Sequence, residues 1–397
     1  MLIHWVWYAT LPNISLRQKL ELLRHFSGPE DIFYIENFDN IPQIPAPVGK
    51  ALENKDLTLA RSVIKGCGEK QVGILTMADA GYPSRLKNIA TPPLVLYYKG
   101  VLPDFEGQPV IGVVGTRKAS AYGMNIARTI SREIAACGGL VVSGGAGGID
   151  TAALQGAGST GNQTVAVLGC GVNVAYPKTN WELFVQISKN GCLLSEYLPD
   201  SEPKTWQFPE RNRIISGLSN GVLVIEAPVK SGALITARDA FEQGRDIFAV
   251  PGNIDVVTCQ GSNGLLQEMA TPVFCGWDVL KTYAAQYPYA VEKREVQKPN
   301  FSRQQVAETV IFPKLEQPEP KKVIDNRVTN AYSDLEYKLS QQEERVLACL
   351  DLNPKSVDWV IAQTGLPAPE VLRILTTLAL KGMVVNHPGR LVSANYR

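Results

Sequence analysis

The sequence predicts an α/β protein built around a doubly wound, Rossmann-like sheet, because one unit recurs at least five times between residues 110 and 252. Each unit is a short apolar run, followed by a glycine-rich turn and an amphipathic stretch. Short runs rich in β-branched residues are typical of buried parallel strands rather than helices. The predicted strands are 110–114, 140–143, 164–168, 221–225 and 246–250.

Amphipathic segments fill the intervals between these strands. Alternating strands and helices require crossover connections, which make neighbouring strands parallel. The turns that follow the strands then share one edge of the sheet, and ligands of such sheets bind outside the carboxyl ends of the strands. A binding site is therefore expected along that edge. The predicted helices are 123–137, 150–158, 180–188 and 231–243.

A chain of 397 residues is too long for one ordinary core and predicts two or three domains. Residues 1–75 are predicted to form a small helical module of the SAM or helix-hairpin type, with Ser15 as a helix N-cap. The sheet domain is predicted over 76–284. Residues 285–333 mix charges with Pro and Gln and have no periodicity, which predicts a flexible linker.

The last region, 334–397, predicts a winged-helix domain of three helices followed by a hairpin. It holds seven basic and seven acidic residues, and its predicted recognition helix carries only Arg373 and Lys381. A helix that reads the major groove usually presents several Arg, Lys, Asn or Gln side chains on one face. This domain is therefore expected to have a protein-interaction or accessory role. Its predicted elements are helices 334–350, 356–363 and 368–381 and a hairpin over 383–392.

Composition limits the functions that are possible. With 39 basic and 38 acidic residues, the net charge of +1 excludes nucleic-acid binding by bulk charge, so any such binding must be local. The seven cysteines are scattered without a Cys-x-x-Cys pair, which favours a reducing cytoplasm over disulfides or zinc. Residues 1–11 lack the pattern of a signal peptide, and no apolar stretch could span a bilayer. We expect a cytoplasmic protein without membrane insertion.

The first turn of the sheet has features of an anion site. It is neither Gly-x-Gly-x-x-Gly nor a Walker loop, so the usual dinucleotide and triphosphate sites are not supported. Gly115 allows close backbone approach, Thr116 offers a hydroxyl, and the helix that follows supplies unpaired N–H groups. Arg117 adds a bidentate donor suited to phosphate. The alternative is that Arg117 is an exposed side chain paired with a neighbouring acid.

The second turn, 143–150, contains four glycines, among them Gly144 and Gly147. So many glycines cost conformational entropy, which is expected where the backbone must approach another group closely. Asp150 is predicted to cap the helix that follows.

The third turn, 169–181, places a cation and an aromatic side chain three residues apart at a helix start. Lys178 suits a phosphate and Trp181 suits a base, the pairing that single-stranded nucleic acid needs. Tyr176 and Asn180 lie in the same stretch. The alternative is that Trp181 packs in the core and Lys178 is a solvated charge.

The segment 208–219 carries Arg211 and Arg213 at the front of a helix, and their spacing directs them to different sides. One is expected to tie this loop to the sheet. The three histidines all lie outside the sheet domain, so imidazole catalysis and common metal sites have little support there. Glu196 and Glu226 lie near strand ends, but their separation is not visible in the sequence. No cofactor is predicted.

Seven motifs in order resemble the DNA-processing protein A family (DprA, also called Smf). The resemblance implies a bacterial cytoplasmic protein of natural transformation that binds incoming single-stranded DNA, dimerises through the sheet domain and loads the recombinase RecA, without catalysis. It also implies that Arg117 and Lys178 contact DNA, with Trp181 matching the family's aromatic residue. The motifs are 115–117, 143–150, 176–178, 194–197, 208–218, 231–236 and 244–252.

Two positions depart from the family pattern: Leu154, where relatives usually carry His, and 145–147, where a Leu-Ala-Lys/Arg pattern is commoner. The second departure removes a cation. One alternative function is a nucleotide-processing enzyme of the phosphoribohydrolase type, but 228–233 lacks the Pro-Gly-Gly-x-Gly-Thr turn that such enzymes need. Another is a winged-helix transcription factor, which would need a more basic recognition helix. The predicted DNA-contacting residues are Gly115, Thr116, Arg117, Gly144, Gly147, Tyr176, Lys178, Asn180, Trp181 and Arg211.

Overall fold

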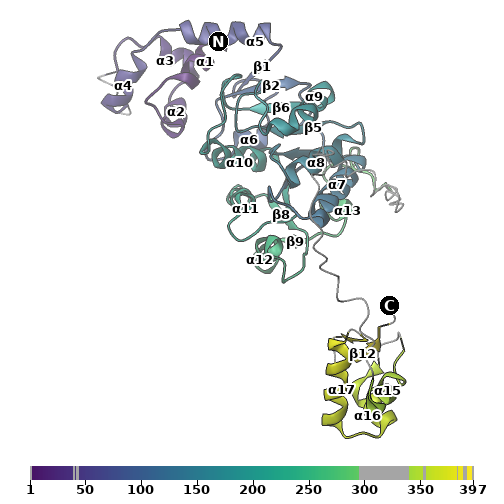
Figure 1. Ribbon diagram of the computed structural model, residues 1–397. Helices are drawn as coiled ribbons and strands as arrows, with labels where there is room; N and C mark the ends of the chain where they lie inside the picture. Colours follow the sequence, from purple (N-terminus) through teal and green to yellow (C-terminus); the bar gives the residue numbers. More distant parts are fainter. Residues whose placement is uncertain are drawn as a thin grey trace, which may run out of the picture. The chain divides into compact units, whose positions relative to one another are not determined.

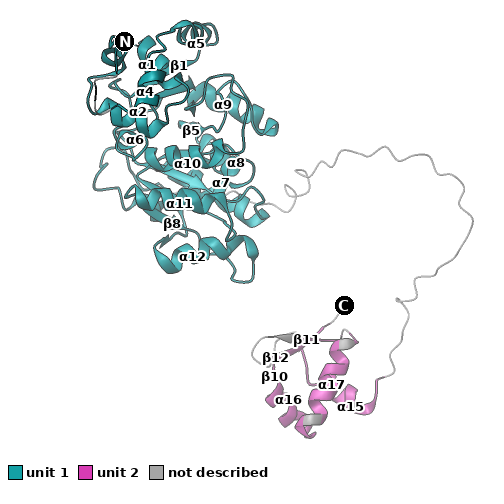
Figure 2. Ribbon diagram, turned by 90° about the vertical axis from the view of Figure 1, so that its left-hand side faces the viewer, with its two compact units in different colours: residues 1–300 teal, residues 301–397 magenta. Residues whose placement is uncertain are grey.

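The computed structural model of the chain forms two compact units, residues 1–300 and 301–397, which Figure 2 shows in different colours. The residues that the structure describes are 2–38, 41, 44–294, 339–351, 355–381, 383–387 and 391–395.

The described part of the first unit contains a nine-stranded sheet in the order β1-β2-β6-β5-β4-β3-β7-β8-β9 (Figure 1). All neighbouring strands from β6 to β9 are parallel, whereas β2 pairs antiparallel with both β1 and β6. The strands are β1 (Gly73–Thr76), β2 (Val95–Gly100), β3 (Val110–Val114), β4 (Leu140–Ser143), β5 (Thr164–Val167), β6 (Cys192–Ser195), β7 (Gly221–Val224), β8 (Asp246–Ala249) and β9 (Thr271–Pro272).

The five predicted strands are confirmed as β3, β4, β5, β7 and β8, with ends within one residue of those expected. Four further strands were not predicted. β6 reads Cys-Leu-Leu-Ser, a run without β-branched residues, and β9 has only two residues, so neither carries a strong local signal. β1 lies across the predicted boundary between the helical module and the sheet domain at residue 75, and β2 precedes the first strand that was predicted.

The strand order reverses at β3. The chain proceeds from β3 through β4 and β5 to β6 on one side, then returns to place β7 against the other side of β3. Val114 and Val224, the last residues of β3 and β7, lie opposite one another in this parallel pair. The turns that leave these two strands therefore diverge and open a crevice at the carboxyl edge, which is where such sheets bind ligands.

Helices cover both faces of the sheet, as expected for a doubly wound fold. Within β3, Ile111 and Val113 pack in one apolar core, while Val110 and Val114 pack in another on the opposite face. The first face is covered by α7 (Ala121–Ala136), α8 (Ile149–Gly158) and α13 (Gly276–Leu280), and the second by α10 (Gln207–Leu218) and α11 (Gly232–Glu242). The remaining helices of this domain are α6 (Ser84–Lys87), α9 (Trp181–Asn190), α12 (Gln260–Glu268) and the 3-10 turns η1 (Lys178–Asn180) and η2 (Val257–Cys259).

The N-terminal module consists of helices whose core continues into the sheet domain through Tyr97 of β2 and Phe184 of α9. Ser15 caps the second of these helices as predicted, since its hydroxyl accepts a hydrogen bond from the backbone N–H of Gln18 at 3.3 Å. The helices are α1 (Leu2–Thr10), α2 (Leu16–Leu23), α3 (Pro29–Phe33), α4 (Ala46–Leu52) and α5 (Thr58–Glu69).

Most of the predicted flexible linker, residues 295–333, lies outside the described part of the chain. Its first ten residues are described and are packed against the sheet domain. Tyr287 and Val291 are buried, and the N–H of Glu292 donates to the carbonyl of Cys137 at 3.2 Å. The packed chain thus continues beyond the predicted boundary at residue 284.

The second unit has the winged-helix arrangement that the sequence predicts. Its three described strands form a sheet in the order β10-β12-β11, and Val346, Val360 and Leu378 from its three helices are fully buried. Residues 334–338 of the first predicted helix lie outside the described chain. The elements are α15 (Gln341–Leu347), β10 (Lys355–Ser356), α16 (Val357–Thr364), α17 (Ala368–Leu380), β11 (Val384–His387) and β12 (Leu391–Ala394). Across both units, none of the helices described is long and apolar enough to cross a bilayer.

Candidate nucleic-acid interface

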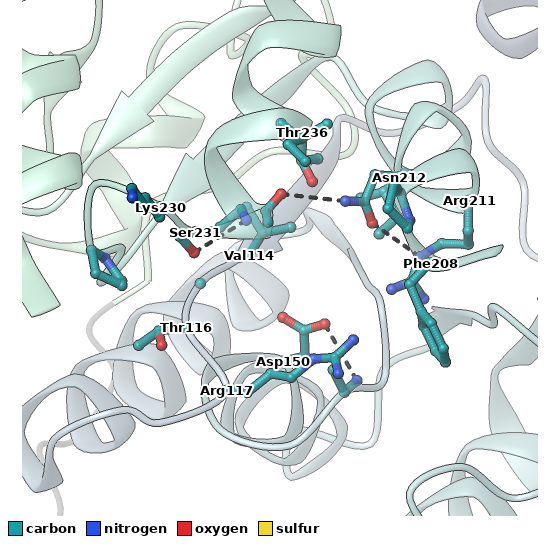
Figure 3. Close-up of a pocket in the computed structure, with 18 of the residues that line it drawn as sticks. Val114, Thr116, Arg117, Asp150, Phe208, Arg211, Asn212, Lys230, Ser231 and Thr236 are labelled. Carbon is teal, nitrogen blue, oxygen red and sulfur yellow. Dashed lines mark hydrogen bonds between the residues drawn. The ribbon is translucent and has the colours of Figure 1, made fainter. Parts of the chain in front are cut away.

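A pocket of about 430 Å³ lies where the strand order reverses. The turn after β3 and the start of α11, which follows β7, line the pocket together with residues of α10. Ala146, Asp150 and Tyr176, from the segments after β4 and β5, complete the lining, and Figure 3 labels Asp150 beside Arg117. The charged residues that line it are Arg117, Arg211, Lys230 and Asp150, three cations and one acid. Its position and its charge both suit an anionic ligand.

Arg117 is exposed at this pocket and lies over an aromatic ring. Its guanidinium carbon is 5.1 Å from the centre of the Phe208 ring, and that ring lies 5.3 Å from the ring of Tyr176. Arg117 forms no ion pair with an N···O distance within 4 Å in the described part of the chain, although the charge of the buried acid Asp150 acts on it from nearby. A stacked guanidinium keeps its N–H donors free in the ring plane, where a phosphate can accept them.

Hydrogen bonds to the segment after β7 and to the start of α8 hold the backbone of the first turn in place. The N–H of Thr116 donates to the carbonyl of Glu226 at 2.7 Å, and its own carbonyl accepts from Ile149 at 3.2 Å. A Cβ on Gly115 would lie 2.5 Å from Ile149. The close approach that the sequence predicted at Gly115 is therefore made by a core side chain of α8, and Thr116 is only 8 % exposed.

The glycine-rich second turn wraps around a buried polar pair. A Cβ on Gly144 would lie 2.6 Å from both Asp150 Oδ2 and Arg211 Nη2, so this position must be glycine. Gly148, with φ of 79°, requires the left-handed backbone conformation that glycine adopts readily. A Cβ on Gly147 would meet no atom within 4 Å. Of the two glycines of this turn that were predicted to contact DNA, Gly144 and Gly147, only Gly147 has open space where a ligand could approach.

Arg211 and Asn180, both predicted to contact DNA, are buried and hold this turn in place. Arg211 is 3 % exposed; its Nη1 donates to the carbonyl of Gly144 at 2.6 Å and to that of Val167. Asn180 is 5 % exposed, and its Nδ2 donates to the carbonyl of Gly145 at 3.0 Å. Arg211 is thus the arginine that ties its loop to the sheet. Their placement favours a positioning role, and a direct DNA contact by either remains an untested prediction.

Asp150 does not cap α8, and that prediction was wrong: the N-cap position belongs to Gly148, and Asp150 lies in the first turn. Its Oδ2 instead accepts a hydrogen bond from the backbone N–H of Ala146 at 3.3 Å. Burial raises the pKa of Asp150 to about 6, although the nearby charges of Arg211 and Arg117 oppose the rise. At neutral pH this carboxylate therefore places a negative charge next to Arg117 (Figure 3).

We expect Asp150→Asn to tighten DNA binding at pH 7.5 and to flatten its pH dependence. Since the pKa is about 6, the wild-type carboxyl loses its proton as the pH rises from 5 to 7, and its charge then opposes a phosphate on Arg117. Wild-type affinity should fall over that range by up to about tenfold, the equivalent of one pKa unit. Fluorescence anisotropy titrations at constant ionic strength measure the DNA affinity at each pH. If the affinity of the Asn variant fell with pH as steeply as that of the wild type, Asp150 would not be the cause of the pH dependence.

The third turn leaves its cation and its aromatic rings in solvent. Lys178 is exposed at the start of η1, Tyr176 is 40 % exposed, and Trp181 is 57 % exposed at the first residue of α9. Leu183 and Phe184 of the same helix are buried. The alternative in which Trp181 packs in the core is therefore wrong.

Sequence reasoning did not assign several residues that form this pocket. Phe208 lines the pocket and lies beneath the Arg117 guanidinium. Lys230 and Ser231 stand at the start of α11, where Ser231 caps the helix by accepting from the N–H of Ala233 at 3.3 Å. The sequence signal for this part of the pocket was an aromatic residue, Phe208, in the first turn of the helix that carries Arg211. Its contact with a turn some 90 residues earlier depends on strand order, which the sequence does not show.

The two carboxylates near strand ends do not form a catalytic pair. Glu196 binds Arg213 at 2.5 Å, and Glu226, 1 % exposed, accepts hydrogen bonds from the N–H and hydroxyl of Ser120. Each carboxylate is thus used in holding a loop or a helix start.

Comparison with known proteins identifies the same two regions. Residues 73–284 match the family model of DNA recombination-mediator protein A, and residues 332–390 match that of the DprA winged helix domain. Protein Smf of Synechocystis is 37 % identical over 331 residues, which cover 81 % of this chain and 80 % of the relative. DNA processing protein DprA of Bacillus subtilis is 38 % identical over 219 residues, 55 % of this chain and 74 % of the relative.

Similar solved structures come from the same family as the relatives found by sequence. The X-ray structure of DNA processing protein A from Streptococcus pneumoniae is similar with a TM-score of 0.62 and 34 % identity, covering 71 % of this chain and 98 % of that one. The Helicobacter pylori protein, whose structure concerns its single-stranded DNA binding mode, gives 0.50 and 29 % identity over 55 % of this chain and 97 % of that one. With its sheet domain, its winged helix and four fifths of its length matched, the chain belongs to the DNA recombination-mediator protein A family, the DprA/Smf family of DNA processing proteins.

Proposed function

We propose that this protein binds single-stranded DNA along the carboxyl edge of its sheet and loads the recombinase RecA onto that DNA during natural transformation, without catalysis. The observation that carries the proposal is a series of cations and aromatic rings along the edge: exposed Arg117 over half-buried Phe208, exposed Tyr176 beside that ring, then exposed Lys178 and Trp181. Single-stranded DNA is bound by cations that follow the phosphates and rings on which bases stack. Its relative from Helicobacter pylori binds single-stranded DNA.

Such an edge favours single strands over duplex DNA. In a duplex the bases are stacked on each other and cannot stack on Trp181 or Tyr176, whereas a single strand offers its bases freely. The near-neutral net charge of the chain supplies little attraction for duplex phosphates elsewhere.

We therefore expect the purified chain to bind an oligothymidylate at least about tenfold more tightly than a duplex of the same length at moderate salt. Affinity should fall linearly with the logarithm of salt concentration, with a slope of about 0.7 for each phosphate neutralised. Anisotropy titrations across a salt series give both quantities. Equal affinity for the two forms of DNA would argue for a different use of this edge.

A dimer through the sheet domain is also part of the proposal. β9 is one of the two edge strands of the sheet, and exposed apolar side chains follow β8 and β9 along the chain: Ile254 at 88 %, Val257 at 64 % and Phe274 at 77 %. Exposed apolar side chains and an unpaired strand edge both favour association with a second copy. Light scattering at micromolar concentration tests this, and a monomer mass would count against it. We place the protein in the cytoplasm, where RecA and incoming DNA would meet it.

RecA loading is tested separately. Addition of the protein to single-stranded DNA coated by a single-strand binding protein should shorten the lag before RecA hydrolyses ATP. An unchanged lag, with DNA binding intact, would leave DNA binding as the whole function.

A further inference from the structure

A small apolar groove lies next to Trp181, along the side of α9. Trp181, Val185 and Ser188 recur at positions i, i+4 and i+7 of this helix and so share one face. With the loop after β5 and with Lys99 of β2 they line a depression of about 50 Å³. Trp181 is thus both the last aromatic residue of the proposed DNA edge and the first wall of this groove.

Lys99 brings a cation to the groove. It is half-buried on β2, and its Nζ is 3.5 Å from Asn173 Oδ1, a long and weak contact. The charge of Lys99 also acts on Asp200, a carboxylate that is already engaged by Lys70 Nζ at 2.8 Å and by Asn173 Nδ2 at 3.0 Å. The ammonium of Lys99 is therefore available to a phosphate at the side of the groove.

We propose that the groove takes one further nucleotide of the DNA strand beyond Lys178 and Trp181, with the edge of its base against Trp181 and Val185 and its phosphate on Lys99. This inference rests on the proposed function. It is carried by the continuity of the groove with the DNA edge through Trp181 and by the complementary charge of Lys99 and a phosphate. A strand held there turns from the carboxyl edge of the sheet and follows α9.

The groove would hold a nucleotide through its phosphate and the apolar edge of its base, and would not distinguish one base from another. The Ser188 hydroxyl donates to the carbonyl of Val185 at 2.9 Å, and the amide group of Asn173 donates to Asp200. These polar side chains are already engaged, so the contact with the base is apolar and tolerates any sequence. A volume of about 50 Å³ accommodates the edge of a ring rather than a whole base.

The test compares Lys99→Gln with Lys50→Gln, a matched change of an exposed lysine on α4 of the N-terminal module. Both variants of the 397-residue chain are titrated with oligothymidylates of about 4 to about 16 nucleotides, the range of site sizes for single-strand binders. Lys99→Gln should bind the shortest oligomers like wild type and lose about threefold to tenfold in affinity for the longer ones. Val185→Glu, which fills the groove with a negative charge, should give the same length dependence.

Failure of the inference differs from failure of the proposed function. If wild type binds single strands, Arg117→Ala weakens them, and Lys99→Gln matches Lys50→Gln at every length, the groove carries no nucleotide. If wild type itself binds no single-stranded DNA, the proposed function fails. If Lys99→Gln changes the mass of the protein in light scattering and leaves DNA binding unchanged, the groove is an interface between copies and the inference is overturned.

Discussion

Replacement of Arg117 by Ala is expected to weaken binding of single-stranded DNA by about tenfold, because a charge-assisted phosphate contact is lost. Lys178→Ala should have a similar effect, and each change should reduce the salt slope by about 0.7. Both side chains are exposed, and neither forms an ion pair in the described part of the chain, so the fold should be unaffected. The double variant should lose about a hundredfold if the two contacts are independent.

Anisotropy titrations over a salt series measure these effects. Arg61→Ala, which removes an exposed arginine from α5 of the N-terminal module, is the control and should leave affinity and slope unchanged. If the Arg117 and Lys178 variants kept the wild-type slope, the strand would not follow this edge, even with affinity reduced.

Arg211→Met is expected to lower the free energy of unfolding by about 3 kcal/mol at neutral pH. The side chain is 3 % exposed, donates to the carbonyls of Gly144 and Val167, and faces the buried carboxyl of Asp150. Met fills a similar volume but leaves both carbonyls unpaired and the carboxylate without its main compensating charge. Urea unfolding followed by circular dichroism measures the loss.

The pH dependence of the stability lost in Arg211→Met shows whether the charge of Asp150 causes the loss. The pKa of Asp150, about 6 in the folded protein, lies above the ordinary value of 3.8, so this group favours folding most below pH 4 and less as the pH rises through 6. Without Arg211 the folded-state pKa rises further, so the deficit of Arg211→Met should be greater at pH 8 than at pH 5. Asp150→Asn combined with Arg211→Met should remove this dependence, and a deficit that is constant with pH would show that Asp150 takes no part.

The elements that were predicted correctly are those that depend on residues close together in the sequence. Strand runs such as 110–114, the helices between them and the Ser15 cap depend on residues a few positions apart, and all appear where expected. β6 was missed because its run of Cys, Leu and Ser carries a weak local signal. The places of β1 and β2 in the sheet depend on antiparallel pairing with partners distant in the chain, down to β6, which the sequence does not show. Asp150 was misassigned because Gly148 ends the turn two residues earlier.

At the site, the sequence alone determined that cations and glycines follow the strands at one edge, and that Arg117, Lys178 and Trp181 stand in those turns. Only the tertiary structure decided which turns meet. It placed β7 against β3, brought Phe208 beneath Arg117, and buried Arg211 and Asn180 beneath the glycine turn. The physical reason is that residue type and spacing determine strands and turns, whereas burial of a given side chain depends on packing between segments far apart in the chain.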